Sequence, residues 1–235
     1  TSGSSGNIMF STSNVGSQGA SGSILLATGT SQSGMSGSLS LSTGASMEGS
    51  SGDLLFAVGS SNTEGGDIGV MIGAGRNRGG NLVLEAGDGK VGGIVNVFGG
   101  AGKLTGGNIK IMSGSSQELS SGNIQIFTQS THSDGGRLLL HTGDSIDGKS
   151  GDVMFQTGNG ASVGSLTLHI SKSLTSVGGE INLQAGNSHS KTGGAIRMVS
   201  GGSESGSSGS VDIHTGNAGS TGKSGDISIG TGISV

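Results

Sequence analysis

The strongest constraint on this chain is a nine-residue phrase that recurs along its whole length. "SGDISIGTG" (224–232) has close copies in "SGDVMFQTG" (150–158) and "SGSLSLSTG" (36–44), in which mainly alternate letters change. We take as the anchor of each unit the glycine that stands two residues before an aliphatic residue, and the anchors follow one another at short and nearly regular intervals. The sixteen anchors are Gly6, Gly22, Gly37, Gly52, Gly66, Gly80, Gly93, Gly107, Gly122, Gly136, Gly151, Gly164, Gly179, Gly194, Gly209 and Gly225. An uninterrupted series of this kind is typical of repeat proteins, in which each unit packs on its neighbours.

Two positions of every unit are apolar. The second residue after the anchor is Ile, Leu or Val in all sixteen units, and the fourth residue after it is also apolar in all sixteen. Apolar residues at every second position predict a strand with one buried face, whereas a helix needs spacings of three and four. Each unit is therefore predicted to be a strand of about seven residues followed by a loop of about seven, rich in Gly, Ser, Asn and Thr.

The pattern predicts an all-β fold, a parallel β-solenoid (β-helix) of sixteen strand-loop units of about 15 residues each. A membrane barrel is disfavoured because its strands are longer and carry aromatic girdles, and this chain has no Trp or Tyr. Two units per turn would bring the apolar rows of two sheets face to face, which makes this the favoured arrangement. One unit per turn, three units per turn and a sheet that is not a solenoid remain alternatives.

The composition excludes several classes of protein. The chain has 53 Gly but is 30% hydrophobic and only 11% charged, which differs from the low hydrophobicity and high charge of disordered chains. A net charge of -4 without a visible basic patch, and 2% aromatic residues, argue against nucleic acid as a partner. The absence of Cys excludes disulfides and thiolate zinc sites. No long apolar run is present, so no transmembrane segment is predicted.

We predict no catalytic residue, no cofactor and no metal ligand. The candidates are the histidines, the aspartates that directly follow an anchor, and the glycine-rich "GAGRNRGG" (73–80). The histidines have no carboxylate at metal-ligand spacing, the aspartates suit local turns, and 73–80 lacks the Lys-Ser/Thr ending of a phosphate loop. These residues are His132, His141, His169, His189 and His214, and Asp53, Asp67, Asp152 and Asp226.

One outward position is unusually apolar. Met71, Phe98, Met112 and Phe127 each stand five residues after an anchor, on the side of the strand opposite the apolar rows. A contiguous exposed apolar patch marks an interface, whereas scattered apolar residues need no explanation. We therefore consider a lateral interface of the protein with itself, with tolerant surface positions as the alternative.

The phrases "GGEINLQAG" (178–186) and "GGNLVLEAG" (79–87) resemble the repeats of filamentous-haemagglutinin-type adhesins. The repeats are rich in Gly, Ser and Thr, and in this they are also similar to large repetitive cell-surface proteins of algae and other protists. The resemblance implies a secreted protein and, for the adhesins, a right-handed parallel β-helix. It implies no functional residue, because the shared letters occupy only core and corner positions.

Together these features predict a non-enzymatic extracellular or cell-surface structural protein, a rigid β-solenoid rod or a filament or appendage subunit. Residues 1–235 are expected to form a single repeat domain, a segment of a longer chain or a polymerising subunit. The expected partner is the protein itself or further repeats of a parent chain, because end strands with Ile8 and Ile229 look like internal ones and would need covering. The alternative function is an adhesin or binding module that holds glycans, matrix or another protein on the flank of the solenoid.

Overall fold

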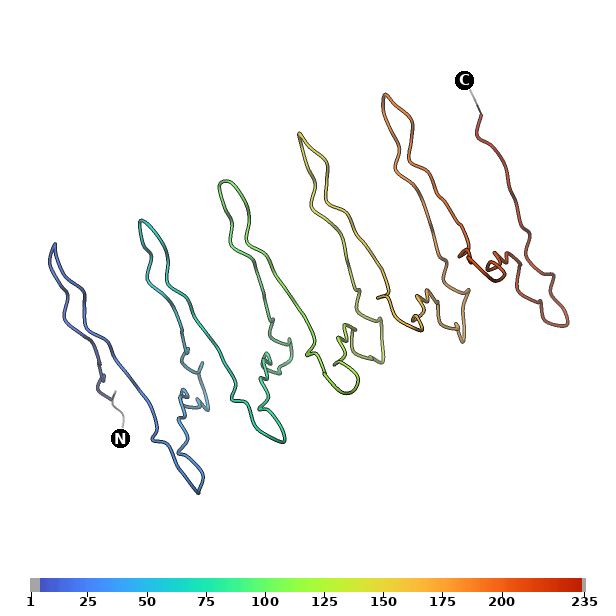
Figure 1. Cartoon of the computed structure of the whole chain (residues 1–235). Coiled ribbons are helices and arrows are strands. Elements are labelled where there is room, and N and C mark those ends of the chain that lie inside the picture. The colour runs from blue at the N-terminus through green and yellow to red at the C-terminus, as the bar shows by residue number, and fades with distance from the viewer. Residues whose placement is uncertain (1–4, 234–235) are drawn as a thin grey trace. The chain divides into compact units, whose positions relative to one another are not determined.

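The computed structural model describes residues 5–233, and within this range the chain contains no helix and no strand. Extended stretches reverse direction at short bends, as Figure 1 shows. We call the stretch from an anchor glycine to the sixth residue after it an arm, and the stretch from there to the next anchor a loop. Every loop contains one bend. The bends lie at 17–19, 32–34, 47–49, 62–63, 76–77, 89–91, 103–104, 117–119, 132–134, 146–148, 161–162, 174–176, 189–191, 204–206 and 220–222.

The chain divides into two parts, which we call the N-terminal half (Thr1–Gln117) and the C-terminal half (Glu118–Val235). Each half contains eight of the sixteen anchors, and both halves show the same succession of arms and loops. The division falls in the loop between the arms that begin at Gly107 and Gly122.

The predicted parallel β-solenoid is wrong for this structure. The backbone hydrogen bonds between residues of 5–233 lie at the loops, and no arm forms a ladder with another arm. The proposed packing of two sheets, with two units per turn, is therefore not found, and neither is the β-helix that the adhesin resemblance implied.

The reason for this difference is that alternation gives an arm an apolar face but does not give it a partner. Long-range pairing must overcome the backbone entropy of a chain with 53 glycines, and glycine loses more conformational freedom on ordering than any other residue. Glycine-rich strands also specify their register weakly. Anchor spacings that vary from unit to unit add a further mismatch between equivalent positions of successive units. Local structure therefore forms, and regular pairing does not.

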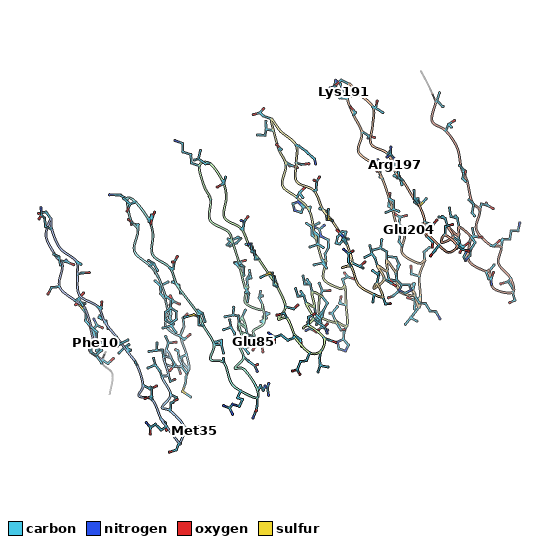
Figure 2. All side chains as sticks on the ribbon, in the orientation of Figure 1. Phe10, Met35, Glu85, Lys191, Arg197 and Glu204 are labelled. Atoms are coloured by element: carbon cyan, nitrogen blue, oxygen red, sulfur yellow. The ribbon has the colours of Figure 1, made fainter. Side chains whose placement is uncertain are left out.

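The apolar rows that were predicted to be buried are exposed. No side chain among residues 5–233 is buried. At the second position after the anchor the exposed fraction is 85% for Ile8 and between 52% for Ile124 and 63% for Leu166 in the other units. Figure 2 shows Phe10, Met35 and Glu85 projecting from separate parts of the trace. The structure consequently has no hydrophobic core in the described range.

The exposed area measures how much surface is left uncovered. The chain exposes 24598 Å², whereas a folded monomer of 22.5 kDa exposes about 9,500 Å². The difference, about 15,000 Å², is what a compact fold of this mass would remove from water. This surplus is the main feature that any account of the protein has to explain.

Candidate interaction surface

The loops contain the backbone hydrogen bonds of the described range, and most loops begin with a contact between successive units. In most units the sixth residue after an anchor lies against the next anchor glycine, whereas nothing lies within 4 Å of a Cβ added at Gly52 or Gly164. A Cβ added at Gly80 would lie 2.6 Å from Cγ2 of Ile72, and one added at Gly179 would lie 2.9 Å from Cγ2 of Ile170. These two anchors are therefore glycines because a neighbouring side chain occupies the space that their own would need.

The same position contains most of the residues that are only half-exposed. Seven residues of 5–233 are partly covered, and six of them stand six places after an anchor, the seventh being Ser173 in a loop. The six are Ala86, Thr142, Thr157, Ala185, Ser200 and Thr215. In these six units a small side chain lies at the junction between arm and loop, while other units have a larger one there, such as Ile72 at 45% exposed.

Backbone hydrogen bonds close several loops at their base. The N–H of Gly107 donates to the carbonyl of Gly100 at 2.8 Å, and the N–H of Gly80 donates to the carbonyl of Gly73 at 3.1 Å. Gly93, Gly194 and Gly209 donate in the same way to the glycine that stands seven places after the preceding anchor. Positive φ contributes little, because Gly19 at 125° is the single case among residues 5–233.

Loop length selects how the bend is held, through the ninth residue after the anchor. In six loops with the same anchor spacing as Gly22 and Gly37, a serine at this place accepts a hydrogen bond on Oγ from the backbone N–H three residues later, at 2.8 to 3.1 Å. These serines are Ser31, Ser46, Ser145, Ser173, Ser188 and Ser203.

Shorter loops use a different arrangement. In two loops that are shorter by a single residue, Ser61 and Thr131 accept the N–H only two residues later, at 3.1 and 3.3 Å. In others a glycine takes the ninth place, and at Gly75 and Gly102 a Cβ would collide with the carbonyl oxygens of Arg78 and Thr105. The sequence interpretation missed this device, although a hydroxyl or glycine nine places after most anchors is its visible signal.

The residues of the predicted lateral interface are all exposed. The exposed fractions are 92% for Met71, 84% for Phe98, 82% for Met112 and 66% for Phe127. Met71, Phe98 and Met112 lie on three different arms of the N-terminal half, and Phe127 belongs to the C-terminal half. Their role as an interface stays a prediction, and their exposure makes them available for it.

The two sides of an arm differ in exposure in some units and not in others. On the arm that begins at Gly107, Ile109 is 53% exposed, whereas the outward Met112 is 82% exposed. On the arm that begins at Gly136, by contrast, Leu138, Leu139 and Leu140 are 53%, 56% and 61% exposed, so the outward Leu139 is not more exposed than its neighbours. The apolar and mixed positions of an arm therefore alternate in the sequence without a matching difference in exposure in every unit.

The polar candidates form no site in the described range. Residues 5–233 contain no group of three or more His, Asp or Glu side chains that could hold a metal ion, and no pocket. Nδ1 of His141 lies 2.9 Å from the carbonyl oxygen of Thr142, a contact within the arm's own end. Asp152 pairs with Lys149 at 2.8 Å rather than with the backbone of a turn. Loop 73–80 leaves Arg76 and Arg78 exposed beside its closing hydrogen bond.

No family model matches the chain, and neither does any curated protein or solved structure. Within residues 5–233, no helix has the length and apolar character that crossing a membrane requires. The chemistry of the chain's own surface therefore has to carry the functional argument.

Proposed function

We propose that this protein is a non-enzymatic structural component of an extracellular or cell-surface assembly, a filament or appendage subunit built by association of its own repeats. The observation that carries the proposal is the uninterrupted series of aliphatic side chains that the arms leave exposed, such as Ile124 at 52% and Leu138 at 53%. Apolar residues at two fixed positions of sixteen successive units are an unfavourable surface for a chain that works alone, because exposed apolar patches promote association.

The amount of uncovered surface favours a polymer over a simple pair. A standard protein–protein interface buries roughly 1,600 Å² in total. The surplus of about 15,000 Å² is many times larger than one such interface, so several faces of each chain need contacts. A filament or a lateral array supplies contacts on several faces, whereas a closed dimer supplies them on one.

The remaining surface chemistry suits dense packing. Only 11% of residues are charged and the net charge is -4, so copies meet little like-charge repulsion. The backbone of an unpaired arm also offers N–H and C=O groups that a neighbouring chain can bond, as any uncovered strand edge does. The resemblance to adhesin repeats and to repetitive surface proteins supports a location outside the cell.

Association can be tested on the purified 235-residue chain. Sedimentation velocity between about 0.1 and 50 µM should show concentration-dependent growth, since each apolar contact adds roughly 25 cal/mol per Å² buried. Negative-stain images of the assembled fraction should show elongated particles. A chain that stays monomeric over this range would contradict the proposal and favour a self-sufficient binding module.

A second experiment addresses the location. Antibodies against the chain should label the surface of intact, unpermeabilised source cells. Labelling that appears only after permeabilisation would contradict the extracellular part of the proposal and leave the association part standing.

A further inference from the structure

Acidic and basic residues of the N-terminal half are separated along the sequence. Residues 1–75 contain no Lys or Arg, although they contain four carboxylates between positions 48 and 67. Residues 76–110 then contain five basic side chains and two acidic ones. We name residues 48–67 the acidic segment, with Glu48, Asp53, Glu64 and Asp67, and residues 76–110 the basic segment, with Arg76, Arg78, Lys90, Lys103 and Lys110.

The charges of both segments are exposed and form no ion pair with the residues that the structure describes. Every charged side chain of both segments is exposed. Within residues 5–233, no charged side chain of either segment takes part in an ion pair, and the pair between Lys149 and Asp152 lies outside both segments. Both segments lie within the N-terminal half, Thr1–Gln117, so the separation of charge is a property of that half alone.

The basic segment coincides with the outward apolar residues. Met71 precedes it by a few residues, Phe98 lies between Lys90 and Lys103, and Met112 follows Lys110. The exposed fractions of these three apolar side chains are 92%, 84% and 82%. The acidic segment likewise contains an outward Leu, at position 55, which is 83% exposed. Exposed apolar side chains with polar and charged residues around them are typical of a protein–protein interface.

We propose that the occupant of this surface is a second copy of the same chain, bound out of register so that its acidic segment faces the basic segment of the first copy. This inference rests on the proposed self-association and specifies its geometry. A copy stacked in register would place carboxylate on carboxylate and guanidinium on guanidinium, which is unfavourable. A two-fold or staggered arrangement satisfies both segments of each chain, because each copy offers one segment of either sign.

The repeat allows such a shift without loss of apolar contact. Because every unit has apolar residues at the same two positions, a copy displaced by whole units still places apolar rows opposite apolar rows. The apolar rows thus supply contact area in any unit register, and the charges select among the registers. Complementary potentials generally determine partner and register more than raw affinity.

A charge-swap pair tests the inference. The first variant, R76E/R78E/K90E, makes the basic segment acidic, and the second, D53K/E64K/D67K, makes the acidic segment basic. Each variant alone should associate at least tenfold more weakly than the unaltered chain in sedimentation velocity at about 50 mM salt, where screening is weak. An equimolar mixture of the two should regain association, because each segment then meets its opposite on the other chain.

The controls separate this inference from the proposed function. The control variant K172E/K191E/R197E changes three charges of the C-terminal half. Its association constant should lie within about twofold of that of the unaltered chain. If the swapped variants assemble as well as that control, or if their mixture regains nothing, the charge-directed register is overturned while self-association stands. If the unaltered chain does not associate at all, the proposed function and this inference are both overturned.

Discussion

Arms and loops of this protein differ in an instructive way. The arms share one sequence pattern, with apolar residues at the same two places in every unit, yet in the described range they form no ladder and bury no side chain. The loops vary in length and sequence, yet they contain most of the hydrogen bonds, such as Gly34 N–H to Ser31 Oγ at 3.0 Å. The most regular part of the sequence therefore lies in the arms, whereas most of the hydrogen bonds lie in the loops.

The difference follows from the distance over which each signal acts. A serine that accepts an N–H three residues later closes a small ring, so its entropy cost is low and no other part of the chain is needed. An aliphatic row lowers the free energy only when a second apolar surface covers it. The loops are thus complete within one chain, whereas the arms depend on what binds them.

The largest expected effect comes from a charge on an arm. Leu82→Asp should abolish association, because an interface that covers the aliphatic row would bury a carboxylate without a partner, at a cost of several kcal/mol. The unassociated chain should tolerate the change, since Leu82 is 54% exposed there. Sedimentation velocity at about 10 to 50 µM measures both states.

The matched control is Asn81→Asp, which adds the same charge one residue earlier on the opposite side of the arm. It should leave association within a few-fold of the unaltered chain. Equal losses from both changes would contradict the assignment of the aliphatic row as the covered face.

A smaller effect is expected from a glycine in a loop. Gly102→Ala would place a Cβ against the carbonyl oxygen of Thr105, so the loop must open at a cost of about 1–3 kcal/mol. The amide of Gly107, which donates to Gly100 at 2.8 Å, should then exchange with solvent at least tenfold faster.

Gly114→Ala serves as the comparison for this variant, because nothing lies within 4 Å of a Cβ added there. Hydrogen exchange of the Gly107 amide should be unchanged in this variant. Similar exchange in both alanine variants would show that the carbonyl approach at Gly102 has no structural role.

Removing one loop hydroxyl should have a modest, local effect. Ser145→Ala removes the acceptor for the N–H of Gly148, a bond of 3.1 Å whose net contribution is about 0.5–1.5 kcal/mol. The Gly148 amide resonance should move toward its random-coil shift and gain temperature dependence, and Ser145→Thr should restore it. Ser150→Ala, which alters a hydroxyl in the same loop, should leave the Gly148 amide unchanged.

The smallest effect is expected for the exposed ion pair. The Lys149 and Asp152 side chains are 79% and 74% exposed, and pairs in such positions contribute little. Lys149→Met should therefore change neither association nor the loop amide resonances measurably, like Lys172→Met on a lysine outside that pair. A clear loss of association in the first variant alone would mean that Lys149 contacts another chain.

Sequence reasoning found the units and their boundaries. The predicted difference between the two sides of an arm is seen between Ile109 and Met112, at 53% and 82% exposed, but not between Leu138 and Leu139, at 53% and 56%. Sequence reasoning erred in pairing the arms into a solenoid, because pairing depends on register and on the entropy of a glycine-rich chain, which no local pattern contains. It also missed the hydroxyl at the ninth position, although that signal is as local as the alternation.

The sequence by itself determined where this chain extends, where it bends and which side of each arm is aliphatic. Backbone stereochemistry and hydrogen bonds over two or three residues suffice for these features, as at Ser145 and Gly148. Only the tertiary structure decided that Ile124 and Leu138 remain exposed and that the junction residues, such as Thr142, are the better covered ones. The physical reason is that burial requires a second surface, and the apolar alternation of one chain specifies such a surface without supplying it.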